Sequence, residues 1–353
     1  MDIFRIDMEK SRVNSHSLDF GRAVCYTVFE AYKASKRNKE KTMNKKTYFY
    51  IDDVIWLFRD LARERPASIY DNSFMKMLKE AHDKYGMKVQ LNIFLRTDFY
   101  YGNDEFCLSE MPDCYKDEFT AASDWLKFGF HSKQEFPDYP FVNASYEDVK
   151  ALLDETKAEV FRFAGEKSFA YAVVPHWLPI SKEGCRALHD GGIKIMSVSS
   201  GERTPYSGDP TTLPYGHSFR LLHNRQPETM LYRRGTRLKA IDSSICAYNH
   251  ISAELADKMR LTFDYHVDEE IGIAFKRFCP GPCLNLTPLE EIEEECLAKG
   301  IAEAEYFGYA THEEYFYPEY FAYQPEYAEK LMKAAELVHK HGYEYFFVEE
   351  LVK

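Results

Sequence analysis

One segment constrains the fold more than any other, the run TYFYIDDVIWLF from Thr47 to Phe58. Its aromatic and β-branched residues predict a buried β-strand. The strand ends abruptly at two adjacent acids, Asp52 and Asp53, and two charges at the end of a buried strand call for partners. Because side chains alternate along a strand, the two carboxylates are expected to point in different directions. One could hold a cation while the other faces substrate or water.

Strands and helices alternate from this segment to the C-terminus. After a loop, hydrophobic periodicity predicts helices at residues 73–85, 116–125, 146–159, 182–189 and 325–341, with Ser145 as an N-cap. Further strands are predicted at residues 88–95, 126–131, 168–174, 192–199, 305–311 and 343–348. About seven strands that alternate with helices predict an α/β fold, a parallel barrel rather than an antiparallel sheet.

The alternation breaks between about residues 200 and 300, which carry Pro, Gly and scattered β-type segments. The expected organisation therefore has four parts. They are an N-terminal helical flank and linker at residues 1–45, a first barrel part at 46–200, an insertion subdomain at 201–300 between the fifth and sixth strands, and a last barrel part at 301–353. Within the flank, residues 17–35 are expected to form an amphipathic helix.

The charge balance excludes some partners. The chain has 45 basic and 57 acidic residues, a formal net charge of −12, which argues against nucleic acid and anionic membranes. The N-terminal residues have no apolar signal segment, so a cytoplasmic location is expected. The eight cysteines are expected to be reduced thiols.

Titratable residues follow the predicted strand ends. Asp52 and Asp53 end the first strand and His131 the third, while His176 follows the fourth and His312 the sixth. In parallel α/β barrels the chemistry collects at the carboxyl ends of the strands. Four strands would therefore deliver such groups to the same rim.

One hypothesis is that residues at this rim bind a metal ion. Glu135 comes four residues after His131, so one helical turn would place both side chains on the same face. With Asp53 they form a ligand set that suits zinc, manganese or a related divalent ion. Such an ion lowers the pKa of a bound water toward about 7. Asp52 could then take a proton, and His312 could give one to a leaving group.

Each of these residues could also have a purely structural role. One of the two adjacent aspartates could cap the next helix, and His131 could be a satisfied structural histidine. Glu135 could be a solvated loop acid, and His176 could pack beside Trp177 or bind a sugar. The two acids after His312, at positions 313 and 314, are expected to include one helix-capping carboxylate.

At these residues the chain resembles the polysaccharide deacetylase superfamily, also called carbohydrate esterase family 4. YIDD, FHSKQE and ATHEEYF are similar to its first, second and last motifs, and the resemblance spans roughly residues 45–200 and 300–353. It implies an incomplete seven-stranded (β/α) barrel, with the insertion between the fifth and sixth strands. It also implies Asp52 as catalytic base, Asp53 and His131 as metal ligands, and His312 as general acid. Zinc is the expected cofactor, with manganese, cobalt or nickel as alternatives.

The chain departs from the family pattern in two motifs. Glu135 stands where the second motif normally has its second metal-binding histidine. In the third-motif region, Val173 stands at the position of an arginine and His176 at that of a tyrosine. His176 and Trp177 are the candidates for substrate binding.

Three functions remain open from the sequence. The leading hypothesis is a metal-dependent hydrolase that removes an acyl group from an amino sugar or related carbohydrate conjugate. A metal-free glycosidase would use a pair of carboxylates, and a carbohydrate-binding protein would use a barrel that has lost catalysis. A homo-oligomer is also possible, with the insertion at its interface.

Overall fold

The computed structural model describes residues 44–97, 105–135, 140–141, 144–178, 180–198 and 253–352 of the 353-residue chain. Nearly all of these belong to one unit, Lys45–Lys353. The predicted helix at 17–35 and residues 201–252 of the predicted insertion lie outside the described residues. Among the helices that are described, none has the length and apolar character required to cross a membrane.

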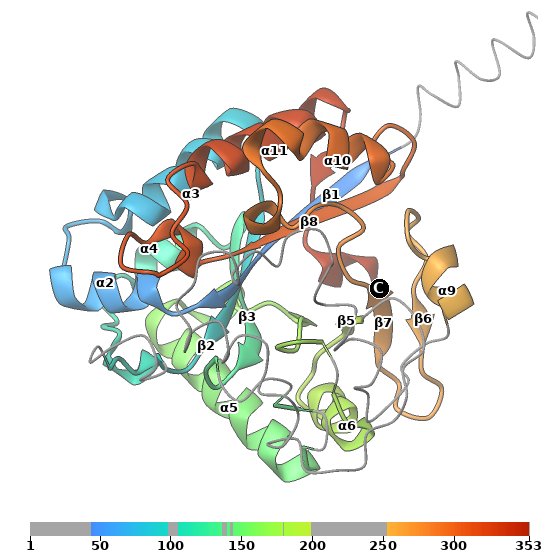
Figure 1. Ribbon diagram of the computed structural model, residues 1–353. Helices are drawn as coiled ribbons and strands as arrows, with labels where there is room; N and C mark the ends of the chain where they lie inside the picture. Colours follow the sequence, from blue (N-terminus) through green and yellow to red (C-terminus); the bar gives the residue numbers. More distant parts are fainter. Residues whose placement is uncertain are drawn as a thin grey trace, which may run out of the picture. The chain divides into compact units, whose positions relative to one another are not determined.

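The unit is an α/β fold in which helices cover a largely parallel set of strands (Figure 1). The strands are β1 (Lys46–Val54), β2 (Val89–Phe94), β3 (Leu126–Ser132), β4 (Ala172–Val173), β5 (Ile195–Val198), β6 (His266–Val267), β7 (Ala274–Arg277), β8 (Tyr306–His312) and β9 (Glu344–Tyr345). The helices are α2 (Trp56–Glu64), α3 (Ser73–Tyr85), α4 (Lys116–Ala121), α5 (Tyr146–Phe163), α6 (Lys182–Asp190), α9 (Ala253–Lys258), α10 (Ile292–Ala298) and α11 (Tyr327–Lys340).

These strands form two sheets. One has the order β3-β2-β1-β8 with β9 also paired to β1, and the other has the order β4-β5-β7-β6. Adjacent strands are parallel except β6 and β7. Isolated bridges pair Phe128 of β3 with Phe169, just before β4, and Ala310 of β8 with Cys283, after β7. The predicted α/β fold with parallel strands is confirmed, and closure into a seven-stranded barrel stays a prediction.

Several strands differ from the prediction. The last one, β9, covers only Glu344–Tyr345 of the predicted residues 343–348. The fourth strand is limited to β4, because residues 166–168 form a turn of 3-10 helix. Strand β7 was not expected, since it lies within the predicted insertion. It pairs in parallel with β5, from Ile195↔Ala274 to Val198↔Arg277. Part of the segment 201–300 therefore contributes to the sheet, while the proposed domain boundaries stay predictions.

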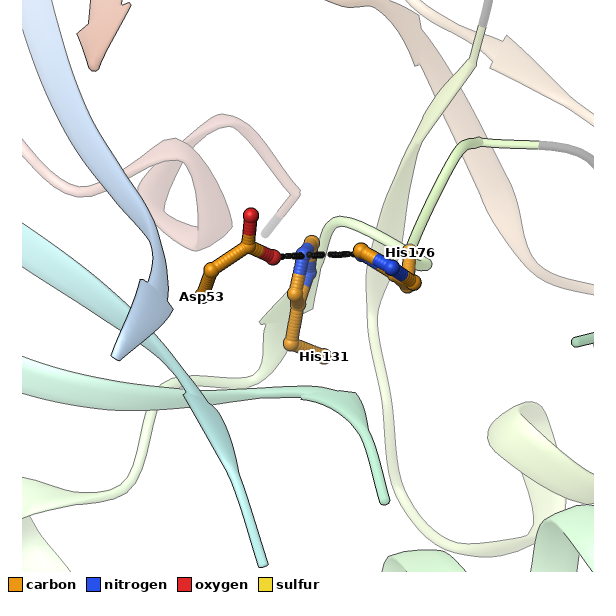
Figure 2. A group of neighbouring side chains, drawn as sticks. All are labelled: Asp53, His131 and His176. Atoms are coloured by element: carbon orange, nitrogen blue, oxygen red, sulfur yellow. Dashed lines mark hydrogen bonds and ion pairs between the residues drawn. The ribbon is translucent and has the colours of Figure 1, made fainter. Parts of the chain in front are cut away.

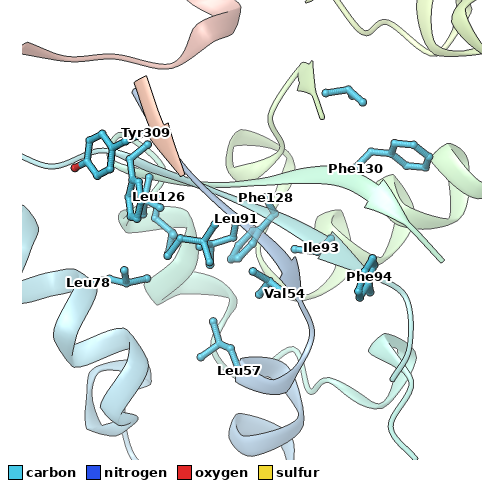
Figure 3. Packing of buried hydrophobic residues seen from close by; sticks show 14 of the residues in the cluster. Val54, Leu57, Leu78, Leu91, Ile93, Phe94, Leu126, Phe128, Phe130 and Tyr309 are labelled. Carbon is cyan, nitrogen blue, oxygen red and sulfur yellow. The ribbon is translucent and has the colours of Figure 1, made fainter. Parts of the chain in front are cut away.

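Strand β1 is buried on both faces, as is usual for a strand inside a parallel sheet. Phe49 and Ile51 belong to the main core, whereas Tyr48 and Tyr50 belong to a second apolar cluster on the other face. Figure 3 shows the main core, where side chains of β1, β2 and β3 meet those of α2 and α3, among them Val54, Leu57, Leu78, Leu91 and Phe128.

Short polar side chains begin several helices. Ser145 accepts a hydrogen bond from the Asp148 amide at 3.1 Å, which confirms it as the N-cap of α5. Asn72 and Ser181 cap α3 and α6 in the same way. These contacts satisfy amide groups that have no partner within the helix.

Helix α2 is the exception, because its cap comes from a distant part of the chain. Its own N-cap residue, Ile55, supplies no side-chain hydrogen bond. The buried carboxylate of Glu313 accepts instead from the amides of Ile55, Trp56 and Leu57, each at 2.7 Å. One of the two acids after His312 is thus a helix cap, as predicted. This contact fixes the end of β1 to the end of β8.

We expect Glu313→Ala to lower the free energy of unfolding by about 2–4 kcal/mol, because it leaves buried amides without an acceptor. Burial raises the pKa of Glu313 to about 7, and three backbone amides oppose that rise. Urea denaturation at pH 8, where the carboxylate is charged, measures the change. Glu254→Ala is the control, because Glu254 and its ion-pair partner Lys258 are both exposed on α9, so its loss should cost less than about 1 kcal/mol. Equal effects of the two substitutions would contradict the capping role.

Candidate metal centre

Three side chains from segments of both sheets meet near the carboxyl ends of their strands. Asp53 ends β1, His131 belongs to β3, and His176 follows β4 (Figure 2). His131 Nε2 lies 3.0 Å from Asp53 Oδ1, and His176 Nδ1 lies 3.2 Å from the same oxygen. The two ring nitrogens are 3.1 Å apart, and all three residues are buried. This set could hold a metal ion.

A local change in the backbone turns Asp53 toward this group. Regular alternation puts Asp52 on the same side as Tyr48 and Tyr50, and would put Asp53 among the helices. Asp53 instead has φ 62°, in the left-handed region, and the pairing register of β1 with β2 shifts between Ile51 and Val54. A non-glycine residue in this region costs about 1–3 kcal/mol, and such residues cluster at functional sites. The strain therefore serves to place the carboxylate.

Two backbone carbonyls fix which nitrogen of each histidine carries a proton. His131 Nδ1 donates to the Val174 carbonyl oxygen at 2.6 Å, and His176 Nε2 donates to the Glu135 carbonyl oxygen at 3.0 Å. In the neutral rings the lone pairs consequently lie on His131 Nε2 and His176 Nδ1. Both face Asp53 Oδ1, so while both rings are neutral three acceptors converge with no donor among them. A shared cation or proton would resolve this conflict, and carbonyl-oriented histidines are typical of metal ligands.

The pKa shifts follow the same arrangement. Burial lowers the pKa of His176 and so favours its neutral ring. Burial would also lower the pKa of His131, but its hydrogen bond to Asp53 and the nearby negative charges raise it. Burial would raise the pKa of Asp53, but the two adjacent histidines, which favour its negative charge, hold it well below the usual range. Asp53 is therefore charged, and it attracts a proton or a metal ion to the two nitrogens.

The predicted ligand set is brought together only in part. Asp53 and His131 meet, and the nearest further nitrogen comes from His176, which was predicted to bind substrate. Glu135 contributes its carbonyl to His176, and its carboxylate lies 4.0 Å from His176 Nε2. That carboxylate forms a second group with Asp53 and Glu314. An aspartate with two histidines suits zinc and related borderline ions.

Asp52 is held by a chain of amide side chains. Asn92 Nδ2 donates to Asp52 Oδ1 at 2.6 Å, and Gln90 Nε2 donates to Asn92 Oδ1 at 2.7 Å and to the Ala172 carbonyl oxygen at 3.0 Å. Gly129 of β3 makes room for this chain, since a Cβ there would lie 2.5 Å from Gln90 Nε2. Sequence reasoning missed these residues. Two amides spaced by two positions on one face of an apolar strand were the available signal.

His312 lies beside Asp52, in register with it across β1 and β8. Its Nδ1 donates to Asn285 Oδ1 at 3.0 Å, so Nε2 is the nitrogen that can exchange a proton at the site. That nitrogen is 3.9 Å from Asp53 Oδ2. Cys283 also donates to Asn285, and burial raises its pKa to about 12, which keeps it a thiol. Asp52 and His312, which were predicted to lie at one rim, are thus neighbours at the ends of β1 and β8.

The residues after His176 also have unusual backbone conformations. Trp177 and Leu178 have φ values of 62° and 73°. The Trp177 ring lies 6.0 Å from that of His176 and is half-buried. Such conformations persist only where the surrounding structure holds them, and they are common at functional sites. Substrate binding by Trp177 stays a prediction.

No protein-family model matches the sequence, and no curated protein matches it as a relative. Among solved structures, a 4-alpha-glucanotransferase from Thermococcus litoralis is similar at 12% identity and a TM-score of 0.46 over 87% of this chain. This chain spans 40% of the glucanotransferase's length. A protein provisionally named a polysaccharide deacetylase, from Mycobacterium smegmatis, is similar at 12% identity and a TM-score of 0.38, with 88% of this chain and 90% of that one covered. At these values neither likeness carries an argument about function.

We expect His176→Ala to weaken zinc binding by more than the roughly 10–100-fold that loss of a ligand's hydrogen-bond partner costs. The reason is that the substitution removes a ligand nitrogen itself. Calorimetric titration of metal-free protein with Zn²⁺ measures the change in dissociation constant.

His189→Ala is the matched control, because His189 is an exposed histidine on α6 and should leave zinc binding unchanged. Glu135→Gln should also keep tight zinc binding, since the carbonyl that orients His176 remains. Loss of zinc binding in Glu135→Gln, with retention in His176→Ala, would instead support the ligand set expected from the sequence, which is Asp53, His131 and Glu135.

Proposed function

We propose that the protein is a metal-dependent hydrolase of the deacetylase type, a divergent relative of the polysaccharide deacetylase superfamily. Its substrate would be an acylated amino sugar or a related carbohydrate conjugate. The observation that carries the proposal is the convergence of Asp53 Oδ1, His131 Nε2 and His176 Nδ1, while a backbone carbonyl holds the proton of each ring on its other nitrogen. Such a set fits a divalent cation, zinc first among the candidates.

A zinc ion bound there would supply a Lewis acid that polarises the acyl carbonyl and makes water a better nucleophile. Asp53, His131 and His176 would hold it. Three protein ligands leave coordination positions for water and substrate, as in catalytic rather than structural zinc sites. This assignment replaces Glu135 with His176 and keeps the other two expected ligands.

Asp52 is the proposed general base. It lies next to Asp53 in the chain, and alternation turns its carboxylate to the interior face of β1. Asn92 holds one of its oxygens, so the carboxylate has a fixed orientation for accepting a proton. The support for this role is its position and the resemblance of YIDD to the first deacetylase motif.

His312 is the proposed general acid. Asn285 fixes the proton on Nδ1, and Nε2 faces the carboxylate of Asp53 at 3.9 Å. A protonated Nε2 could therefore give its proton to the departing amine of the substrate. His312 is partly exposed, whereas the proposed metal ligands are buried, which suits a residue that meets substrate.

We expect Asp52→Asn and His312→Gln each to lower kcat for acetate release by at least about 100-fold, while zinc content is retained. The reason is that each substitution removes a proton-transfer group and leaves the three ligands in place. Acetate released from N-acetylated amino-sugar oligomers measures activity, and elemental analysis measures zinc. Asp154→Asn is the control, because Asp154 is exposed and pairs with Lys150 on α5.

Two results would contradict the proposal. Cleavage of glycosidic bonds that continues after chelation would favour the metal-free glycosidase. Tight sugar binding by the zinc-loaded protein without acetate release from any acylated sugar would favour the carbohydrate-binding protein.

A further inference from the structure

A small pocket next to the three proposed ligands is lined by carboxylates. Asp53, Glu135 and Glu314 contribute an oxygen each, and these oxygens lie within 4.8 Å of one another. All three residues are buried, and all three line the same pocket. The apolar side of the pocket is formed by Ile55, Trp56 and Phe94.

Glu314 distinguishes this pocket from an ordinary acidic cluster. The residue is only 8% exposed, and its Oε2 is buried with no hydrogen-bond partner. A buried polar atom without a partner costs about 1–3 kcal/mol, and a buried charge costs more. In natural structures such an atom usually has an ion, a water or a ligand as its partner.

The neighbouring charge makes a cation the suitable partner. Asp52, Asp53, Glu135 and Glu314 are all buried around this part of the site. A divalent ion between these carboxylates would complete the buried Oε2 of Glu314 and lower the repulsion between Glu314 and Asp53.

We propose that Asp53, Glu135 and Glu314 form a second divalent-cation site, which shares the Asp53 carboxylate with the first. Three carboxylate oxygens without a nitrogen ligand are the donor set of hard ions such as Mn²⁺ and Mg²⁺. The two sites therefore differ in chemistry, one with imidazole nitrogens and one with oxygens. Ions that share a carboxylate lie about 3.5–4 Å apart in two-metal hydrolases. The inference rests on the proposed function, since Asp53 belongs to both groups.

The small size of the pocket favours an ion over an organic ammonium group. An amino-sugar amine would bring its ring into a space bounded by Trp56, Phe94 and the three carboxylates. A metal ion needs only the oxygens and a few waters. The same carboxylates can thus complete a cation coordination sphere without displacing the apolar wall.

Manganese binding to the zinc-loaded protein tests the second site directly. Zinc keeps the site with two histidines, because it binds nitrogen ligands more tightly than manganese does. Free Mn²⁺ is then counted by electron paramagnetic resonance while the ion is titrated. We expect one Mn²⁺ to bind per zinc-loaded chain, and Glu314→Gln to weaken that binding by at least about 10-fold.

Glu303→Gln is the matched control, because Glu303 is an exposed acid and should leave manganese binding unchanged. Circular dichroism checks folding of Glu314→Gln, and Glu135→Gln provides a second variant with the same expected loss. Zinc-loaded protein that binds no Mn²⁺, or that binds it equally in Glu314→Gln and Glu303→Gln, would overturn the second site alone. Protein that takes up no zinc would overturn the proposed function as well, so the two failures differ.

Discussion

The site depends on one buried carboxylate, that of Asp53, held between two histidine rings. His131 and His176 approach the same oxygen within 3.2 Å, and each ring is turned by a backbone carbonyl on its far side. The carbonyls remove the choice of tautomer, so the rings present lone pairs to the carboxylate. Both rings therefore need a shared cation or proton there. The Asp53 oxygen is thus the place where the segments at the ends of β1, β3 and β4 converge.

The position of the Asp53 carboxylate depends on its strained backbone conformation and on the hydrogen bonds of Glu313 to the start of α2. Asp53 sits at positive φ at the end of β1, where the pairing with β2 shifts register. Three residues later the chain enters α2, whose first amides bind Glu313 at the end of β8. Helix α2 cannot move without breaking buried hydrogen bonds, so the strained turn before it is fixed from both sides. His312, which adjoins Glu313, is placed by the same contact.

The parallel α/β fold and most of the residues at the strand ends could be predicted from the sequence, because local patterns indicate strand ends and titratable residues. Helix α3 was predicted at its observed bounds, and Asp53 and His131 were predicted to meet. Strand β7 was missed because its four residues pair with distant β5 and carry little local signal. His176 was assigned to substrate rather than to the metal for a related reason. A turn of strained residues, invisible in the sequence, points its ring inward.

The residues at positions 135 and 176 are coupled in the proposed site. In the deacetylase pattern that the sequence resembles, two histidines of one loop bind the ion, whereas the second ring of the proposed site comes from the turn after β4. Residue 135 keeps a role, because its carbonyl orients His176. Its carboxylate joins Asp53 and Glu314 in the acidic pocket. In the proposed site the second nitrogen thus comes from His176 after β4, which makes a carboxylate at position 135 compatible with the same cation.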